Sequence, residues 1–539
     1  MNRIKEYFRQ NNISPLRPVL TAFVSILISL MCATGSSVKR FNSLVFDSKF
    51  LIEFICLFIL CFSAVSIFFV LFDYVHEITS QKKIKPAFVF LIALFSLGII
   101  YFIQFLGLYP GLFVFDAPTQ CISYFNHNMS EHHPLLHTLL LGIIMDIFTD
   151  DFTSINHATA VYTILQIILC SLSFSYLLTY LYVRSRSVVL FILNLVYFGF
   201  CPPVVLIVMS ATKDTFFMIF FIVSVVSLLF LFDSENKKNT VINTVILSLS
   251  VTLMTLFRNN CIYALPFLLL PALIIYSKKR KNLLIVAGCF VLLFILYKAV
   301  FVPLAVSHKT DSREMLSVPV QIAARIYTDD NADISAEDRM IVEELIGEDG
   351  RIYIPTIADI TKSTINTEYL NTHKKDVIRM FAHIIRDNPH TALDAFLCLN
   401  CGFWYPNYTL TLMPDGGKGY WPVTCYYPAS INPQIKLIYD YYVDFESKLA
   451  SGSSVILSIL FNPGLYLFFY LVMFSYTIEK KKKSFIPVYI FTGVYFLTFL
   501  LGPVALVRYV IFLYVLFPVY FVNMSEKADS VSDSTSSEK

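Results

Sequence analysis

The chain has 539 residues, of which 56% are hydrophobic, 16% are aromatic and 15% are charged, and its formal net charge is +3 at pH 7. A soluble core of this size would be diluted by more charge, so the composition excludes an ordinary soluble protein, and the small net charge gives no indication of nucleic acid as a partner. Continuous apolar runs of about 18 residues or more predict an all-α polytopic membrane protein, because lipid requires each segment to pair its own backbone polar groups.

The apolar runs predict about twelve transmembrane helices, the first of which is typical of a signal anchor that stays in the membrane. The expected spans are 17–35, 50–72, 87–106, 157–183, 188–207, 215–232, 240–257, 261–276, 283–303, 451–476, 485–503 and 506–523. The expected units are N-terminal helices in 1–106, a first outer loop in 107–156, helices in 157–303, an extracytoplasmic domain in 304–450, helices in 451–523 and a disordered cytoplasmic tail in 524–539.

The basic residues predict the orientation of these spans in a cell membrane. Clusters such as "KKIK" (82–85), "KKRK" (278–281) and "KKKK" (480–483) fall on one side, whereas the other side's short connections carry few cations. The positive-inside rule therefore places the basic clusters and both termini in the cytoplasm. If 135–148 crossed the membrane, every later basic loop would move outside, so this stretch is expected to lie on the outer face.

The first outer loop contains an aspartate that is a candidate catalytic base. The stretch "GLYPGLFVFDAPTQCISYFNHNMSEHHPLLH" (107–137) has acidic residues and histidines but no lysine or arginine. Partial burial near the bilayer surface would raise the pKa of Asp116, and a positioned carboxylate can take a proton from a hydroxyl acceptor. The alternative interpretation is that Asp116 caps the helix that begins at "APTQ".

Histidines follow in the same loop. In "HHPLLH", His133 and His137 stand four residues apart on one helical face, a spacing that metal sites use. Together with Asp116 or an aspartate of "TDD" (149–151), they would form a divalent-metal site. The alternative, in which no cofactor is needed, is a hydrogen-bonding scaffold, with His132 orienting a substrate hydroxyl.

Three isolated cations stand at helix ends on the face that is otherwise poor in positive charge: Lys213, Arg258 and Arg508. Each one alone is explained by an interfacial anchor, or, for Lys213, by pairing with Asp214. Three cations together on this face predict a shared anionic ligand, most simply a phosphate.

The second outer segment contains two predicted helices. "SAEDRMIVEELIG" (335–347) begins with Ser335 and Asp338, which suit a capping box. "KKDVIRMFAHIIRD" (374–387) predicts a longer helix that stops near Pro389, because the residue before a proline disfavours helical backbone.

An aromatic region follows, from 403 to 427, and holds both tryptophans of the protein, Trp404 and Trp421. These residues and Tyr405 either pack as the core of a small domain or present flat faces to sugar rings.

Four cysteines lie outside the expected spans: Cys121, Cys398, Cys401 and Cys425. "CLNC" (398–401) is not followed by the second pair that a zinc ribbon requires. Free thiols remain one interpretation, and a disulfide from Cys425 to Cys398 or Cys401 is the other.

Four motifs carry a resemblance to a known group: "YPG….D…Q" (109–120), "HHPLLHT" (132–138), "SATKD" (210–214) and "RNN.IYAL" (258–265). They resemble a group of bacterial polytopic proteins that are treated as membrane glycosyltransferases of the GT-C superfamily. The resemblance covers residues 100 to 280 and extends weakly over 388–406. It implies an inverting transferase that moves a sugar from a polyprenyl-phosphate carrier to a cell-surface glycan, lipid or protein outside the cytoplasm.

The resemblance also implies roles for individual residues. The catalytic aspartate of such enzymes lies in the first large outer loop, where Asp116 stands, and the three isolated cations would bind the donor phosphate. The polar residues of the same motifs would orient the substrates: Tyr109, Gln120, His132, His133, His137, Asp214, Asn259 and Asn260. Trp404, Tyr405 and Trp421 would contact the acceptor or its sugar.

A transporter or flippase for lipid-linked glycans is the alternative from another class, since twelve spans with both ends inside are common among carriers. The ionisable residues, however, lie at the outer rim and not at mid-membrane, where alternating access places its site. A polysaccharide polymerase or ligase is the alternative among enzymes. The sugar and the acceptor stay open.

Overall fold

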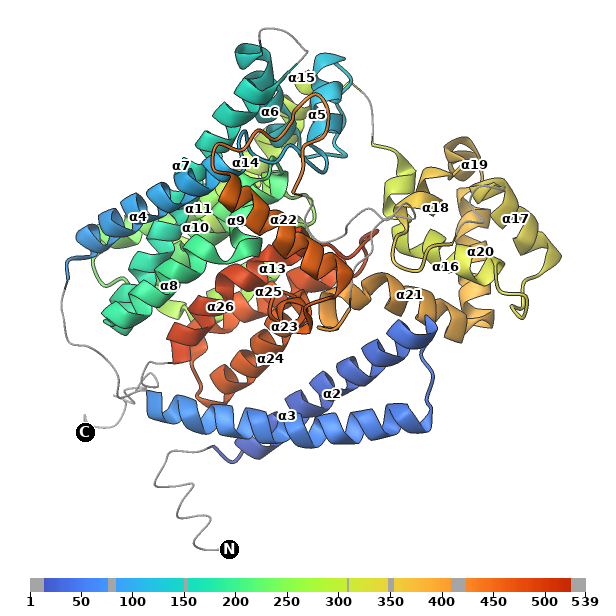
Figure 1. The fold of residues 1–539 in the computed structure, drawn as a ribbon, viewed down its shortest axis with the longest axis horizontal. Helices are drawn as coiled ribbons and strands as arrows, with labels where there is room; N and C mark the ends of the chain where they lie inside the picture. The colour runs from blue at the N-terminus through green and yellow to red at the C-terminus, as the bar shows by residue number, and fades with distance from the viewer. Residues whose placement is uncertain are drawn as a thin grey trace, which may run out of the picture.

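The fold was examined in a computed structural model, which describes residues 14–75, 84–149, 154–307, 310–347, 353–408 and 423–524 (Figure 1). These residues form helices and no named strand, and the isolated β-bridges among them are Leu112 with Ser210 and Ile357 with Val504. The prediction of an all-α protein is confirmed.

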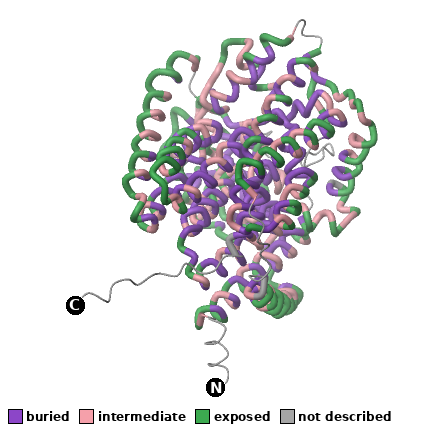
Figure 2. Tube along the Cα trace, turned by 90° about the vertical axis from the view of Figure 1, so that its left-hand side faces the viewer, coloured by how far each residue is buried: buried purple, intermediate pink, exposed green. Residues whose placement is uncertain are grey.

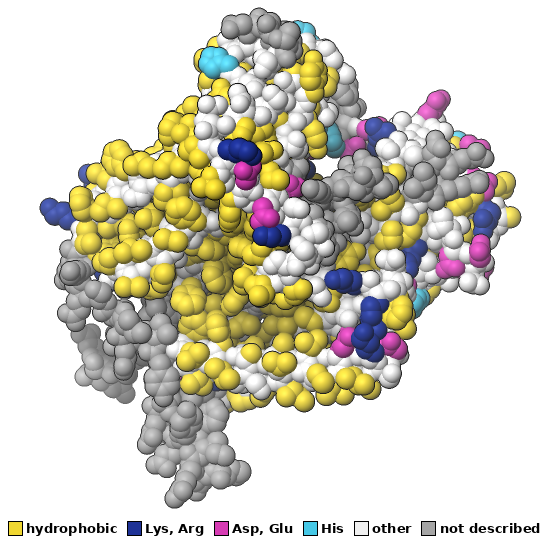
Figure 3. Space-filling model, viewed as in Figure 1, with side chains coloured by type: hydrophobic (Ala, Val, Ile, Leu, Met, Phe, Trp, Pro, Cys, Tyr) yellow, Lys and Arg dark blue, Asp and Glu magenta, His cyan; other side chains and the backbone are white. Residues whose placement is uncertain are grey.

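Seven helices are long and apolar enough to cross a membrane. They are α2 (Arg17–Phe41), α3 (Ser48–Val75), α4 (Pro86–Gly107), α7 (Asn156–Ser185), α10 (Lys213–Asp233), α11 (Lys237–Phe257) and the continuous run η1 (Ser277–Lys279), α14 (Arg280–Leu296), η2 (Tyr297–Phe301) and α15 (Val302–Ala305). Apolar side chains cover the faces of α4, α8, α2 and α3 in Figure 3. The chain is therefore a multi-pass membrane protein.

The other expected spans are broken or short. Helices α8 (Val188–Phe200) and α9 (Pro202–Met209) meet at an angle of 54°. The remaining ones are α12 (Cys261–Ala264) with α13 (Pro266–Ile275), α23 (Val455–Leu460) with α24 (Pro463–Glu479), η5 (Lys483–Phe485) with α25 (Ile486–Phe499), and η6 (Val507–Val510) with α26 (Ile511–Met524). Prolines start many of these pieces, because proline interrupts a continuing helix but suits its first turn. Of the twelve expected spans, seven are confirmed as long apolar helices.

The first outer segment folds as two short helices between α4 and α7. They are α5 (Ala117–Phe125) and α6 (Leu135–Phe148), which pack on each other, and α6 also packs against α7 and α11 of the bundle. With 14 residues, α6 is about 21 Å long, shorter than the roughly 30 Å hydrocarbon core. This length supports a helix that does not cross, while the side of the membrane on which it lies stays a prediction.

The second outer segment divides into two parts. Its first part is a helical domain with its own buried core: η3 (Ser312–Met315), α16 (Ser317–Tyr327), α17 (Ala336–Ile346), α18 (Asp359–Ser363), α19 (Thr367–Thr372) and α20 (Lys374–Asp387). The predicted cap of α17 is confirmed, since the Ser335 hydroxyl accepts the Asp338 amide at 3.0 Å. The expected helix 374–387 is confirmed as α20.

The second part belongs to the membrane bundle. Helix α21 (Pro389–Trp404) packs against α2 and α24, and α22 (Lys436–Ser451) packs against α4. Their buried residues, including Phe403 and Tyr442, share the core of the bundle. Helix α21 also packs on α16, and its Ala392 and Ala395 belong to the core of the helical domain. The expectation of one domain over 304–450 therefore stays a prediction. The expected tail, 524–539, lies almost entirely outside the described residues.

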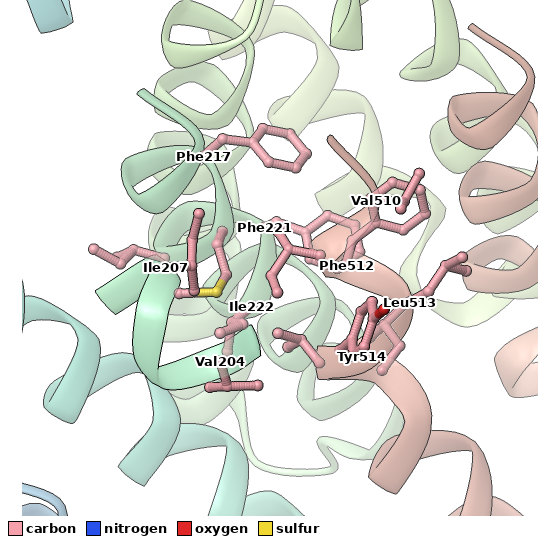
Figure 4. Packing of buried hydrophobic residues seen from close by; sticks show 14 of the residues in the cluster. Val204, Ile207, Phe217, Phe221, Ile222, Val510, Phe512, Leu513 and Tyr514 are labelled. Atoms are coloured by element: carbon pink, nitrogen blue, oxygen red, sulfur yellow. The ribbon is translucent and has the colours of Figure 1, made fainter. Parts of the chain in front are cut away.

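Buried residues make up most of α9, α10 and α26, and the purple segments in the middle of Figure 2 show the buried core of the molecule. Figure 4 shows Ile207 of α9, Phe221 of α10 and Phe512 of α26 in this packing. All three are at most 1% exposed. Close packing of this kind fixes the ends of these helices, where Lys213 and Arg508 stand.

Candidate functional site

The first outer loop is attached by its backbone to the segment before α10. The amide of Leu112 donates to the carbonyl of Met209, and the amide of Ala211 donates to the carbonyl of Leu112, both at 2.8 Å. Gly111, with φ of +106°, lies so close to the Thr163 hydroxyl that a Cβ atom would overlap it. The "YPG" motif is thus explained by a turn that only glycine adopts without strain at this contact.

Tyr109 supports this loop from behind. Its ring meets the Phe105 ring edge-on, with centroids 5.6 Å apart, and its carbonyl accepts the amide of Asn432 at 2.8 Å. The structure therefore places Tyr109 in packing between the loop and the segment after residue 423, and not among the charged residues.

Asp116 lies in an ion-pair cluster with two cations from distant parts of the chain. Its Oδ2 is 2.8 Å from Nζ of Lys213 and 3.3 Å from Nη1 of Arg508. Asp116 occupies the N-cap position of α5, but its side chain accepts no capping hydrogen bond. The capping interpretation is wrong, because the carboxylate is directed to the two cations.

The residue before Asp116 has a strained backbone. Phe115 has φ of +59°, in a region that residues other than glycine rarely adopt. The Arg508 guanidinium lies 4.3 Å from the centroid of its ring. This cation–π contact holds the turn that directs Asp116 towards Arg508.

A second carboxylate, that of Asp214, also belongs to the cluster. Its Oδ2 is 3.1 Å from Nη1 of Arg508, and Oδ1 pairs with Nη1 of Arg258. The Thr212 hydroxyl donates to Oδ2 at 3.2 Å. The interpretation that Lys213 pairs with Asp214 is wrong, because adjacent residues at the start of α10 take different partners.

The exposed fraction of the side chains differs across the cluster, so one side of it is accessible and the other is buried. Asp116 and Lys213 are 26% and 15% exposed, whereas the side chains of Arg508 and Asp214 are 5% and 2% exposed. Nε of Arg508 is buried and has no hydrogen-bond acceptor among the described residues. Three cations face two carboxylates here, so one positive charge is in excess on a desolvated surface. Such a surface suits an anion that enters past Asp116 and Lys213.

The pKa of Asp116 is opposite to the expectation. Burial alone would raise it, but the positive charges of Lys213 and Arg508 outweigh burial and hold the pKa well below the usual 3.8. Asp116 is therefore ionised throughout the physiological range. The expectation of a raised pKa is wrong, because it took account of burial but not of the two partners.

His137 is part of the scaffold behind the cluster. Nδ1 of His137 lies 3.0 Å from the side-chain oxygen Oε1 of Gln120, and Nε2 lies 2.7 Å from the Tyr162 hydroxyl. The Gln120 amide donates onward to Thr138 at 3.1 Å. Burial lowers the pKa of His137 to about 3, so the ring is neutral. Both ring nitrogens are occupied, which agrees with the scaffold interpretation and leaves no nitrogen for a metal.

His132 and His133 lie between this scaffold and the helical domain. Nδ1 of His133 is 3.4 Å from Nζ of Lys213, and Nδ1 of His132 is 3.6 Å from a carboxylate oxygen of Glu314. Burial, followed by the charge of Lys213, lowers the pKa of His133 to about 3. In the part of the chain that the structure describes, no group of three or more His, Cys, Asp or Glu side chains is arranged to hold a metal; residues 150–151 of the alternative metal site lie outside it.

The asparagines of "RNN" border the cluster without entering it. The side-chain amide of Asn259 donates to the backbone carbonyl of Glu131 at 3.1 Å, and the side-chain amide of Asn260 donates to the Thr498 hydroxyl at 2.9 Å. These contacts fix the turn between α11 and α12, and so the position of Arg258. Their role is positioning through the backbone.

The expected acceptor contacts lie elsewhere. Trp404 and Tyr405 are 8% and 9% exposed and belong to the bundle core, with Tyr405 against Gly35 of α2. Both residues pack in a core, but it is the core of the bundle and not that of a small outer domain. Trp421 lies outside the described residues. The cysteines Cys398, Cys401 and Cys425 are free thiols, so the disulfide alternative is wrong.

Sequence reasoning missed the aromatic walls of the cluster. Arg258 lies 4.6 Å from the Tyr509 ring centroid and 5.0 Å from that of Phe499. Tyr509 also contacts Arg508, at 4.8 Å. Its position directly after an isolated arginine was the available signal, because arginine favours aromatic faces.

Fold and site together define a multi-pass helical membrane protein with a buried, cation-rich cluster at one end of its bundle. The chain belongs to a family of unknown function (DUF6020), whose model matches residues 124–538. The matched region includes Lys213, Arg258 and Arg508, and begins after Asp116. Neither the curated proteins nor the solved structures contain a match to the chain.

Proposed function

We propose that the protein is a membrane glycosyltransferase, which moves a sugar from a polyprenyl-phosphate carrier to a cell-surface acceptor outside the cytoplasm. One observation carries the proposal: the Asp116 carboxylate lies within 2.8 Å of Lys213 and 3.3 Å of Arg508. A base beside two phosphate-binding cations is the arrangement that transfer from a sugar phosphate requires.

In this proposal Lys213 and Arg508 bind the donor phosphate. Lys213 is the more exposed cation of the pair, and the buried Nε of Arg508 is a further donor. Arg258 has a supporting role, because it contacts Asp214, which in turn holds Arg508. This assignment refines the sequence-based expectation that all three cations touch the phosphate.

The chemical step is a single displacement. Asp116 takes the proton of an acceptor hydroxyl, and the oxygen forms a bond to the anomeric carbon from the face opposite the phosphate. The bond from that carbon to the phosphate oxygen breaks, and its electron pair leaves on the phosphate. Lys213 and Arg508 stabilise the charge that develops there. When the phosphate shares these cations, they stabilise the Asp116 carboxylate less, so donor binding makes Asp116 a stronger base.

The position of the cluster favours an enzyme over a carrier. Lys213 and Asp214 start α10, Arg258 immediately follows α11, and Arg508 precedes α26. All of these charges stand at helix ends. A carrier that works by alternating access needs its site near the middle of the bundle.

The test is sugar transfer by the purified full-length protein in liposomes. Undecaprenyl phosphates that carry radiolabelled glucose, galactose, mannose or N-acetylglucosamine are supplied with a cell-surface extract, and label in the extract is counted. We expect transfer from one of these donors. Label that crosses the membrane while still attached to its lipid would identify a flippase and overturn the proposal, as would no transfer from any donor.

A further inference from the structure

A polar cleft separates the first outer loop from the helical domain. Its volume is about 580 Å³, within the range of roughly 300–1,000 Å³ that is typical of ligand pockets. One wall is the loop around His132, and the other consists of η3 and the ends of α19 and α20. In Figure 1 the domain stands beside the end of the bundle that carries α5 and α6.

The charges in the cleft wall are balanced. Nε of Arg313 lies 3.3 Å from Asp311 and 3.8 Å from Glu314, and Glu314 also accepts from Lys362 at 2.9 Å. Lys362 does not line the cleft, so the charged lining consists of two acids, Asp311 and Glu314, and two cations, Arg313 and Lys374. Because the acidic groups already pair with basic ones, the cleft lacks the excess of one sign that selects an ion.

Uncharged polar groups complete the lining. The Ser312 hydroxyl donates to the side-chain oxygen Oδ1 of Asn371 at 2.9 Å. Ser130, Thr310 and Thr367 add hydroxyl groups. Hydroxyl groups and side-chain amides can both donate and accept hydrogen bonds, as the hydroxyls of a sugar do. A neutral polyhydroxylated ligand therefore matches this wall better than a phosphate or a cation.

The cleft is connected to the ion-pair cluster through two histidines. The rings of His132 and His133 have their centroids 4.4 Å apart, and His133 contacts Lys213 at 3.4 Å. Lys213 in turn pairs with Asp116. The cleft is thus linked to the candidate base through His132, His133 and Lys213, which lie between a ligand in the cleft and Asp116.

We propose that this cleft binds a neutral carbohydrate, the sugar portion of the acceptor. The assignment to an acceptor rests on the proposed transfer reaction, whereas binding of the carbohydrate itself does not need a donor. The inference also gives the helical domain its function, which is to hold one part of the acceptor while its reacting end extends towards Asp116.

The test measures binding without transfer. Saturation-transfer NMR on the purified full-length protein uses maltotriose, mannotriose, galactotriose and tri-N-acetylchitotriose as neutral probes, with trigalacturonate and inorganic phosphate as anionic ones. We expect one neutral trisaccharide to bind, and Asn371→Trp to weaken it at least tenfold by filling the cleft. Asn371 and Lys374 are exposed, so substitution there is compatible with folding. Lys374→Met, which leaves the wall acidic, should weaken binding more mildly.

Asn331→Trp is the matched control, because Asn331 is exposed on the same domain but does not line the cleft. It should bind as the wild type does. The inference is overturned if no neutral probe binds, if Asn371→Trp and Lys374→Met both bind normally, or if an anionic probe binds more tightly. A protein that binds the trisaccharide but transfers no sugar would instead contradict the proposed reaction and leave the cleft assignment standing.

Discussion

Two buried ion-pair clusters lie at different helix ends, and their composition differs in a way that bears on function. In the first, here the Arg17 cluster, Arg17 contacts Glu479 at 3.1 Å and Asp73 at 2.7 Å, and Lys480 contacts Asp73 at 2.7 Å. It joins the start of α2 to the end of α3 and the end of α24. In the second, the cluster of Asp116, the cations likewise come from helices distant in sequence.

The difference is in charge balance, because the exposed fractions are similar: Asp73 and Lys480 are 22% and 16% exposed, close to the values for Asp116 and Lys213. The Arg17 cluster has two cations and two carboxylates, and the Glu479 side chain is fully buried. The Asp116 cluster has one cation in excess, and its carboxylate is 26% exposed. In a balanced cluster each charge is already neutralised by a partner, whereas a cluster with an excess cation can exchange its internal partner for an anionic ligand.

The largest expected effect separates the two clusters through stability. Arg17→Met leaves the Glu479 carboxylate buried without its guanidinium partner, a change that typically costs about 3–5 kcal/mol. We expect a clearly lower melting temperature in detergent, with unchanged transfer per folded molecule. Arg40→Met is the control on the same helix, since its partners Asp47 and Glu53 are 32% and 26% exposed, and exposed pairs contribute about 0–1 kcal/mol. Equal melting temperatures for both variants would contradict the comparison.

The next effect concerns chemistry. Asp116→Asn keeps the size of the side chain but cannot accept a proton, so transfer should fall by roughly 100-fold or more. Donor binding should persist or tighten, because Lys213 and Arg508 lose a competing carboxylate. Glu131→Gln is the matched control in the same loop, where Glu131 pairs only at the surface with Lys298 among the described residues. Near-normal transfer by Asp116→Asn, measured with radiolabelled donor, would place the base elsewhere.

A smaller effect is expected for Lys213, which is more exposed than Arg508. Lys213→Ala removes a charged contact to the donor phosphate, which is worth about 1.5–3 kcal/mol. We expect kcat/KM for the donor to fall accordingly, while the melting temperature changes little. Lys298→Ala, at an exposed lysine outside the cluster, serves as the control. If both variants use the donor as the wild type does, Lys213 is an interfacial anchor.

The sequence predicted those parts of the molecule that depend on local signals. Ser335 and Asp338 marked the start of α17, and Pro389 marked the end of α20, because capping and proline geometry act within a few residues. The three isolated cations were identified by a charge bias that applies to whole loops. These signals need no knowledge of which helices are neighbours.

The remainder depends on neighbours that the sequence does not display. The contacts of Asp116 with Lys213 and Arg508, and thus the direction of its pKa shift, follow from packing of α9, α10 and α26 (Figure 4). The assignment of α21 and α22 to the bundle has the same origin. The sequence showed the aromatic region that begins at residue 403, but not that α21, which ends within it, packs against α2 and α24.

The smallest expected effect is in the pH dependence, and it tests how the Asp116 cluster works. The value of kcat/KM for the donor reports the free enzyme, in which the pKa of Asp116 is well below 3.8. A lowered pKa keeps the carboxylate in its basic form as the pH falls, so kcat/KM should be flat from about pH 8 to pH 5. His133, with a pKa of about 3, adds no change in this range. In Lys213→Ala the charge that lowers the pKa of Asp116 is absent, so the acidic decline should move to higher pH. A wild-type decline near pH 6.5 that Lys213→Ala does not move would assign the proton transfer to a different group.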